Sequence, residues 1–201
     1  MNSTTVKKQR GVVLVVAMII LLVMSVIGIS SLTSSTMQER MAGNNRQLAL
    51  AKAAAEAALK SAEGFLVANI TTGADLTRFD NAAPADIGLY SSYVLNSEGV
   101  GLKLLSTSIS DIQDDSLWTV GNSVAAGNLS ANVKTRDPRF VIEYIGRETQ
   151  GKAKPWIVGD TSDNKDPHIF MITAIGWGRD QNIYTVLQST FRTGSGADFT
   201  Y

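Results

Sequence analysis

Residues 10–40 read RGVVLVVAMIILLVMSVIGISSLTSSTMQER, and this stretch decides the fold because it carries no charged side chain between Arg10 and Glu39. Apart from Ser25, residues 11–29 are apolar or glycine. A helix of about 20 predominantly apolar residues crosses a hydrocarbon core that is roughly 30 Å thick. We therefore predict one membrane-spanning helix over residues 12–38.

Three basic residues, Lys7, Lys8 and Arg10, stand immediately before the apolar run. Lysine and arginine are enriched in the cytoplasmic flanks of membrane helices. This bias predicts that the N-terminus is cytoplasmic and that residues 40 onward lie across the membrane. Residues 1–10 are polar and basic, as in the first part of a targeting signal, so we interpret residues 1–11 as a leader and not as part of the fold.

The composition of the chain excludes several functional classes. The 201 residues carry 18 basic and 18 acidic side chains, and the three basic residues of the leader leave 15 against 18 for the remainder. A mildly acidic domain without a basic patch does not favour nucleic acid as a partner. The chain has no cysteine, so it forms neither a disulfide nor a thiolate metal site.

The helix is predicted to continue beyond the membrane as an alanine-rich amphipathic segment over residues 39–66. Its apolar stripe follows the 3.6-residue period and consists of Leu48, Ala55, Leu59, Ala62 and Leu66. An alanine-rich helix is marginal by itself and is stabilised mainly by packing of its apolar face. We expect this stripe to pack on a sheet formed by the C-terminal part of the chain.

Residues 67–201 are predicted to form a globular region. Residues 69–138 read as loops with brief strands, for instance over residues 118–120 and 129–133. Alternation over residues 140–145 predicts a half-buried strand, and the runs 168–177 and 182–192 predict an antiparallel hairpin joined by residues 178–181. Phe199 and Tyr201 are expected to fold back onto this region. The fold class is α+β, with a long N-terminal helix packed on a C-terminal antiparallel sheet.

Enzymatic function is not favoured, and we expect no cofactor. The single histidine, His168, lies at the start of a predicted strand, and general base catalysis requires a positioned partner. A structural role is therefore the better interpretation. Asp160, Asp163 and Asp166 are candidate calcium ligands, but their loop lacks the glycine and the distal glutamate of an EF-hand, and Lys165 opposes a cation. We expect a solvated loop and no metal.

The N-terminal segment has two other interpretations besides a leader that is removed before the apolar run. One is an uncleaved single-pass anchor that carries a scaffold or sensor domain. The other is a secreted periplasmic protein with a signal cleaved after the apolar run, at the small residues near 26–28. The mature N-terminus distinguishes them, because it would be Met1 for an anchor and Ile29 for a secreted protein.

The junction Lys7-Lys8-Gln9-Arg10-Gly11-Val12 resembles the leader end of type IV pilins, in which a basic residue and a glycine directly precede an uninterrupted apolar helix. Four further stretches narrow the resemblance to the PilX family of minor pilins: QERMAGN at 38–44, AAAEAAL at 53–59, ITAIGWG at 172–178 and VLQSTF at 186–191.

The resemblance implies a type IV pilin-like fold and a processing step. A prepilin peptidase would cut between Gly11 and Val12, and Val12 would become the N-methylated first residue. The precursor would span the inner membrane once, with its globular domain in the periplasm, before it enters a pilus.

The resemblance also implies a function. Members of the family prime pilus assembly and form a tip complex with other minor pilins, the major pilin below and a large tip-associated adhesin, which supports twitching motility and surface adhesion. Most pilins carry a glutamate at the fifth residue after the cut, where this chain has Val16. A subunit at the tip has no amine ahead of it to pair with that glutamate. A tip subunit of a type II secretion pseudopilus shares this feature and remains an alternative.

Overall fold

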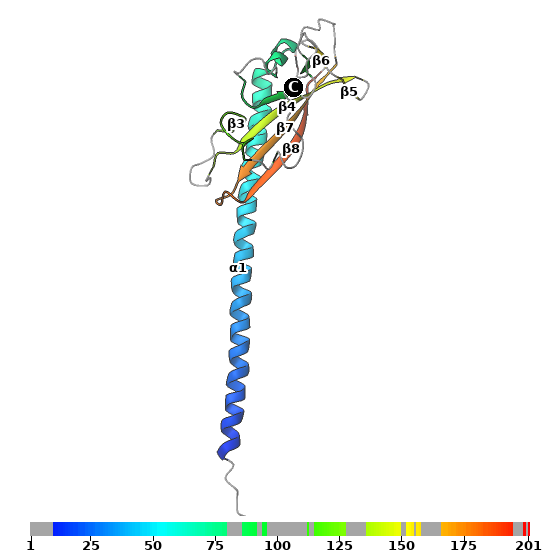
Figure 1. Ribbon diagram of the computed structural model, residues 1–201. Helices are drawn as coiled ribbons and strands as arrows, with labels where there is room; N and C mark the ends of the chain where they lie inside the picture. The colour runs from blue at the N-terminus through cyan, green and yellow to red at the C-terminus, as the bar shows by residue number, and fades with distance from the viewer. Residues whose placement is uncertain are drawn as a thin grey trace, which may run out of the picture. The chain divides into compact units, whose positions relative to one another are not determined.

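The computed structural model describes residues 10–79, 86–91, 94–95, 112, 115–127, 136–149, 152–154, 156–157, 166–194, 199 and 201. The chain forms two compact units, Met1–Arg46 and Gln47–Tyr201. In chain order the elements are α1 (Arg10–Asn69), the 3-10 helix η1 (Gly73–Phe79), β1 (Leu89–Ser91), β2 (Val94–Leu95), β3 (Val124–Ala125), β4 (Arg139–Thr149), β5 (Lys152–Lys154), β6 (Trp156–Ile157), β7 (His168–Trp177) and β8 (Tyr184–Arg192), most of which are labelled in Figure 1.

The first unit consists of the N-terminal part of α1. The predicted membrane segment is helical throughout, and the helix is long and apolar enough to cross a membrane. Its one interior polar residue before Gly28, Ser25, donates a hydrogen bond from Oγ to the carbonyl oxygen of Leu21 at 2.8 Å. Because that hydroxyl is satisfied within the helix, it adds little to the cost of placing the segment in an apolar medium.

The second unit contains the predicted sheet. The strand order is β1-β4-β7-β8, with β3 and β5 also paired to β4, while β2 and β6 form a separate two-stranded sheet. β4 pairs antiparallel with β7, and β7 pairs antiparallel with β8. The predicted α+β fold class and the predicted C-terminal hairpin are therefore confirmed.

The predicted antiparallel sheet is found in β4, β7 and β8, but β1 was not predicted to pair with it and runs parallel to β4. A parallel pair requires a long crossover connection, and residues 92–138 supply one between these two strands. The sheet is mixed, with its long antiparallel part formed by β4, β7 and β8.

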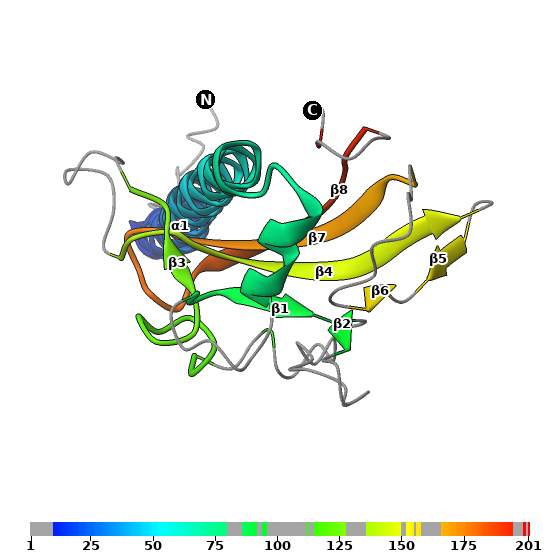
Figure 2. The same ribbon diagram turned by 90° about the horizontal axis from the view of Figure 1, so that it is seen from above.

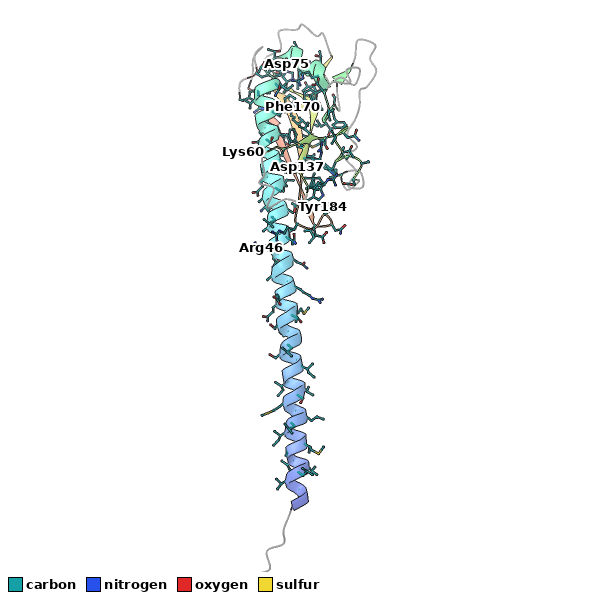
Figure 3. The ribbon with its side chains drawn as sticks, turned by 90° about the vertical axis from the view of Figure 1, so that its left-hand side faces the viewer. Arg46, Lys60, Asp75, Asp137, Phe170 and Tyr184 are labelled. Atoms are coloured by element: carbon teal, nitrogen blue, oxygen red, sulfur yellow. The ribbon has the colours of Figure 1, made fainter. Side chains whose placement is uncertain are left out.

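The C-terminal part of α1 lies against one face of this sheet, as the view along the helix in Figure 2 shows. The core cluster unites α1 side chains with large side chains of β4 and β7, of which Phe170 is labelled in Figure 3. The fully buried members from α1 and these strands are Ala58, Ala62, Leu66, Ile142, Tyr144, Phe170, Ile172 and Ala174.

The backbone of α1 comes very close to the sheet at Gly176 of β7. A Cβ atom added there would lie 2.3 Å from the carbonyl oxygen of Ala51 and 2.3 Å from the backbone nitrogen of Ala55. Glycine is therefore required at this position because two backbones meet with no room for a side chain.

Only some residues of the predicted packing stripe face the hydrophobic core. Ala55, Ala62 and Leu66 have no exposed surface, and Leu59 is partly buried against the same cluster. Leu48 is instead 53% exposed, so its assignment to the packing face is wrong. The sheet ends at this level, where the backbone nitrogen of Arg179 in the β7–β8 connection donates to Oε1 of Gln47 at 2.7 Å.

The predicted strand over residues 118–120 is also wrong, because these residues form a turn that precedes β3. The turn is held by local backbone hydrogen bonds, such as that from the backbone nitrogen of Trp118 to the carbonyl oxygen of Asp115 at 3.1 Å, and by side chains, not by ladder pairing. Nε1 of Trp118 donates to the carbonyl oxygen of Ile112 at 2.8 Å, and the buried Arg139 donates to Oγ of Ser123 at 2.6 Å and to the carbonyl oxygen of Thr119 at 3.1 Å. The other expected strand, residues 129–133, lies outside the described residues.

The two C-terminal aromatic residues fold back onto the domain, as predicted. Phe199 is buried, and its backbone nitrogen donates to the carbonyl oxygen of Thr71 at 2.7 Å. The hydroxyl of Tyr201 donates to the carbonyl oxygen of Ile70, and its ring centroid lies 5.5 Å from that of Phe191. These contacts tie the end of the chain to the end of α1.

Candidate functional site

The apolar part of α1 is the first candidate site, because its side chains are exposed on all sides of the helix. Val12, Ile20 and Leu32 have exposed fractions of 58%, 51% and 70%, and no residue of the most apolar stretch of α1 is buried. A helix that is hydrophobic all round is stable only in lipid or among other apolar helices. The segment is therefore built to enter a membrane or a helical bundle.

The predicted cleavage junction lies at the very start of this helix. α1 begins at Arg10, its first turn has no acidic side chain, and Gly11 has open space where a Cβ would stand. A positive charge at a helix N-terminus opposes the macrodipole, so the local charge does not stabilise this end. The Gly11–Val12 bond thus lies in the first turn of the described helix, where Gly11 and Val12 are both exposed, while Lys7 and Lys8 lie outside the described residues.

Val16 lies on the second turn of the apolar segment and is 48% exposed. The first acidic residue of the described helix is Glu39, so residues 10–38 offer no carboxylate to a neighbouring subunit. Within it, residues 12–24 carry apolar side chains alone.

His168 is part of the core and not of an open site. Its Nδ1 lies 2.8 Å from the hydroxyl oxygen of Tyr144, its backbone nitrogen donates to Oγ1 of Thr193 at 2.9 Å, and its ring packs 4.6 Å from that of Phe199. Burial and, to a smaller extent, the nearby charge of Arg147 together lower the pKa of His168 from 6.5 to about 4, although Asp166 acts in the opposite direction. The imidazole is neutral at physiological pH and holds the C-terminal tail against β4.

The candidate calcium ligands are not brought together by the described residues. Asp160 and Asp163 lie outside them, and Asp166 is half-buried beside Pro167 at the start of β7. Within the described part of the chain, no group of three or more histidine and acidic side chains is arranged to hold a metal ion.

Two family models match the chain. The model described as PilX N-terminal matches residues 10–60, and the model described as type IV pilus assembly protein PilX C-term matches residues 67–193. The chain belongs to the PilX family. It matches no curated protein and no solved structure.

Membership of the PilX family defines the general role of the chain. The chain is a minor pilin of the type IV pilus, a structural component that contacts other pilus components, and the family is not one of enzymes. The exposed apolar segment of α1 suits a single-pass membrane anchor of a pilus-associated protein.

One feature of the globular unit has no counterpart among the residues singled out in the sequence. A pocket of about 330 Å³ lies at the end of the sheet where β7 meets β8, and Tyr184, labelled in Figure 3, is part of its wall. Its other walls come from the turn after residue 112 and from the residues before β4. Because these segments are far apart in the sequence, no local pattern indicates the pocket.

Proposed function

We propose that this PilX-family chain primes type IV pilus assembly and lies at or near the pilus tip. In this proposal a prepilin peptidase cuts between Gly11 and Val12, Val12 is N-methylated, and the apolar segment of α1 first anchors the precursor in the inner membrane with the globular unit in the periplasm. Other minor pilins, the major pilin and a tip-associated adhesin are the partners, and twitching motility and adhesion depend on the complex.

The observation that carries the tip position is Val16. A carboxylate in a bilayer centre costs about 2 to 3 kcal/mol unless it is paired. A shaft subunit recovers that cost when its glutamate pairs with the free amine of the subunit ahead, whereas a leading subunit has no such amine. Valine at this position avoids the cost of an unpaired carboxylate in the membrane, and a tip subunit does not need the glutamate–amine pair.

Processing is tested on the full chain in membranes with a prepilin peptidase. We expect mass spectrometry to find a mature N-terminus at methylated Val12 and to find the untrimmed precursor for Gly11→Glu, because the larger charged side chain does not fit a site shaped for glycine. Normally trimmed Gly11→Glu would contradict the assignment, and a start at Met1 or Ile29 would favour an uncleaved anchor or a secreted protein.

Position in the filament is tested with labelled chain in purified pili. We expect label at one end of each filament, and label distributed along the shaft would overturn the tip position. A deletion strain should lose twitching motility and keep protein secretion, whereas the opposite result would assign the chain to a type II secretion pseudopilus.

The apolar segment is tested by a charge placed in its middle. Ile20→Lys should impair piliation, since residue 20 is surrounded by apolar side chains and its charge would enter lipid or the filament core. Gln38→Lys, which adds the same charge at a polar position on the same helix, is the matched control and should leave piliation intact.

A further inference from the structure

The pocket at the β7–β8 end of the sheet lies on the face opposite α1. Gly176 faces α1, so its neighbours Ile175 and Trp177 point to the other side, where they form a second cluster with Trp118. The pocket of about 330 Å³ is lined by Asp115, Trp118, Arg136, Ile175, Trp177, Gln181, Asn182 and Tyr184. All of these belong to the globular unit, and none has a role in the membrane segment.

The guanidinium of Arg136 lies over an indole. Its central carbon lies 4.2 Å from the ring centroid of Trp177, which is itself only 4% exposed. Nη2 of Arg136 donates to the carbonyl oxygen of Trp118 at 2.9 Å, and Nη1 donates to Oδ1 of Asp115. The indole thus lies on one side of the guanidinium, which also lines the pocket.

The charges of the pocket cancel. Arg136 and Asp115 form an ion pair, and the remaining lining side chains are neutral. A charged ligand would therefore find no uncompensated partner. Tyr184 adds an aromatic ring that is 38% exposed at the mouth, directly across the hairpin from Trp177.

We propose that this pocket receives an aromatic side chain of another pilus subunit. Four of its eight lining residues are arginine, tryptophan or tyrosine, the residue types that are enriched at the energetic centres of protein interfaces. A neutral aromatic ring matches the open face of the guanidinium by a cation–π contact and packs against the ring of Tyr184. The inference rests on the role of the family in pilus assembly, since that role supplies subunits as partners.

A saccharide fits the observations less well. Sugars bind to exposed aromatic faces, and the face of Trp177 is taken by Arg136, which leaves Tyr184 as the only exposed ring among the described lining residues. A saccharide adduct is accordingly one of the outcomes that would overturn the proposal.

The test is photo-cross-linking in pilus-producing cells that express the full chain. p-Benzoylphenylalanine replaces Tyr184 in one strain and Thr190 in the other, since Thr190 is exposed on the same face of β8 and lies far along the strand from the pocket. We expect the 184 strain to yield an adduct with another pilus subunit at least fivefold above the 190 strain, with the attachment site next to a tyrosine, tryptophan or phenylalanine.

Two substitutions in the 184 strain then separate stacking from folding. Arg136→Lys keeps the positive charge near Asp115 but removes the planar guanidinium, so the adduct should fall several-fold while the far-UV circular dichroism spectrum stays that of the folded protein. Replacement of the partner's aromatic residue by alanine should lower the adduct equally.

Four results would overturn the proposal: no adduct, equal adducts from both positions, a saccharide adduct, or a cross-linked segment without an aromatic side chain. Failure of the proposed function is distinguishable, because it would appear as normal piliation in the deletion strain, whereas failure of the pocket leaves the deletion phenotype unchanged.

Discussion

Replacement of Gly176 by alanine tests the packing of α1 on the sheet. The added Cβ would lie 2.3 Å from both the carbonyl oxygen of Ala51 and the backbone nitrogen of Ala55, and 2.8 Å from the carbonyl carbon of Ala54. Ordinary contacts of a Cβ begin near 3.4 Å. The helix and β7 must therefore separate by about 1 Å, because neither backbone can rotate away as a side chain can.

The cost follows from that separation. Overpacking of a core costs about 1 to 3 kcal/mol, and we expect the upper part of this range since the clash involves two backbones. Separation also withdraws the buried methyl groups of α1 from β4 and β7. In a protein of this size 1 kcal/mol shifts Tm by about 2 to 4 °C, so a loss of about 3 kcal/mol lowers Tm by about 6 to 12 °C.

The assay is thermal unfolding of the full chain in detergent, followed by tryptophan fluorescence. The three tryptophan residues, Trp118, Trp156 and Trp177, all belong to the second unit, so the signal reports on the globular part even when the apolar segment remains in the micelle. Gly64→Ala is the matched control. No atom lies within 4 Å of the added Cβ at residue 64, and alanine favours a helix interior over glycine by about 1 kcal/mol.

We expect Gly64→Ala to raise Tm slightly and Gly176→Ala to lower it steeply. If Gly176→Ala unfolds within about 1 °C of the unsubstituted chain, the close backbone contact between α1 and β7 is not part of the folded protein, and the argument for glycine at this position fails.

Two further predictions concern the same core. Leu66→Ala should cost about 2 to 5 kcal/mol in urea unfolding because Leu66 is fully buried, whereas the neighbouring exposed Val67→Ala should cost under about 1 kcal/mol. The pKa of His168 is lowered from 6.5 to about 4, so the unfolded chain takes up the proton first as the pH falls. Stability should therefore drop by about 3 kcal/mol between pH 6.5 and 4. His168→Leu should remove this part of the pH dependence of Tm, and an unchanged profile would contradict a neutral buried imidazole.

The sequence correctly predicts those helices and strands whose apolar residues form a continuous run or repeat with a regular local period. The apolar run before Glu39, the alternation around Ile142 and the runs that form β7 and β8 each identify their element without reference to the rest of the chain. The observed hairpin begins β8 at Tyr184, two residues later than expected, which lies within the usual uncertainty of element ends.

The features that the sequence does not predict depend on distant partners. β1 has three residues, and its direction is set by pairing with β4 about fifty positions later, so no turn chemistry fixes it. The pocket brings Asp115, Arg136 and Trp177 together from three segments. Tryptophan is enriched in strands, which favours a strand at Trp118. The hydrogen bond from its indole to the carbonyl oxygen of Ile112 instead holds it in a turn.

The misassigned Leu48 shows how side-chain size misleads a reading of this helix. A hydrophobic stripe gives most weight to large side chains, and Leu48 has the right spacing to belong to it. The interface with the sheet instead selects small residues, because Gly176 lets the backbone of β7 reach the backbone of α1 at the buried Ala51, Ala54 and Ala55. Such an interface is stabilised by the close packing of many methyl groups more than by the burial of a few large side chains. The alanine-rich sequence between residues 49 and 62, which as an isolated helix would be marginal, is thus the part of α1 that specifies where the sheet must lie.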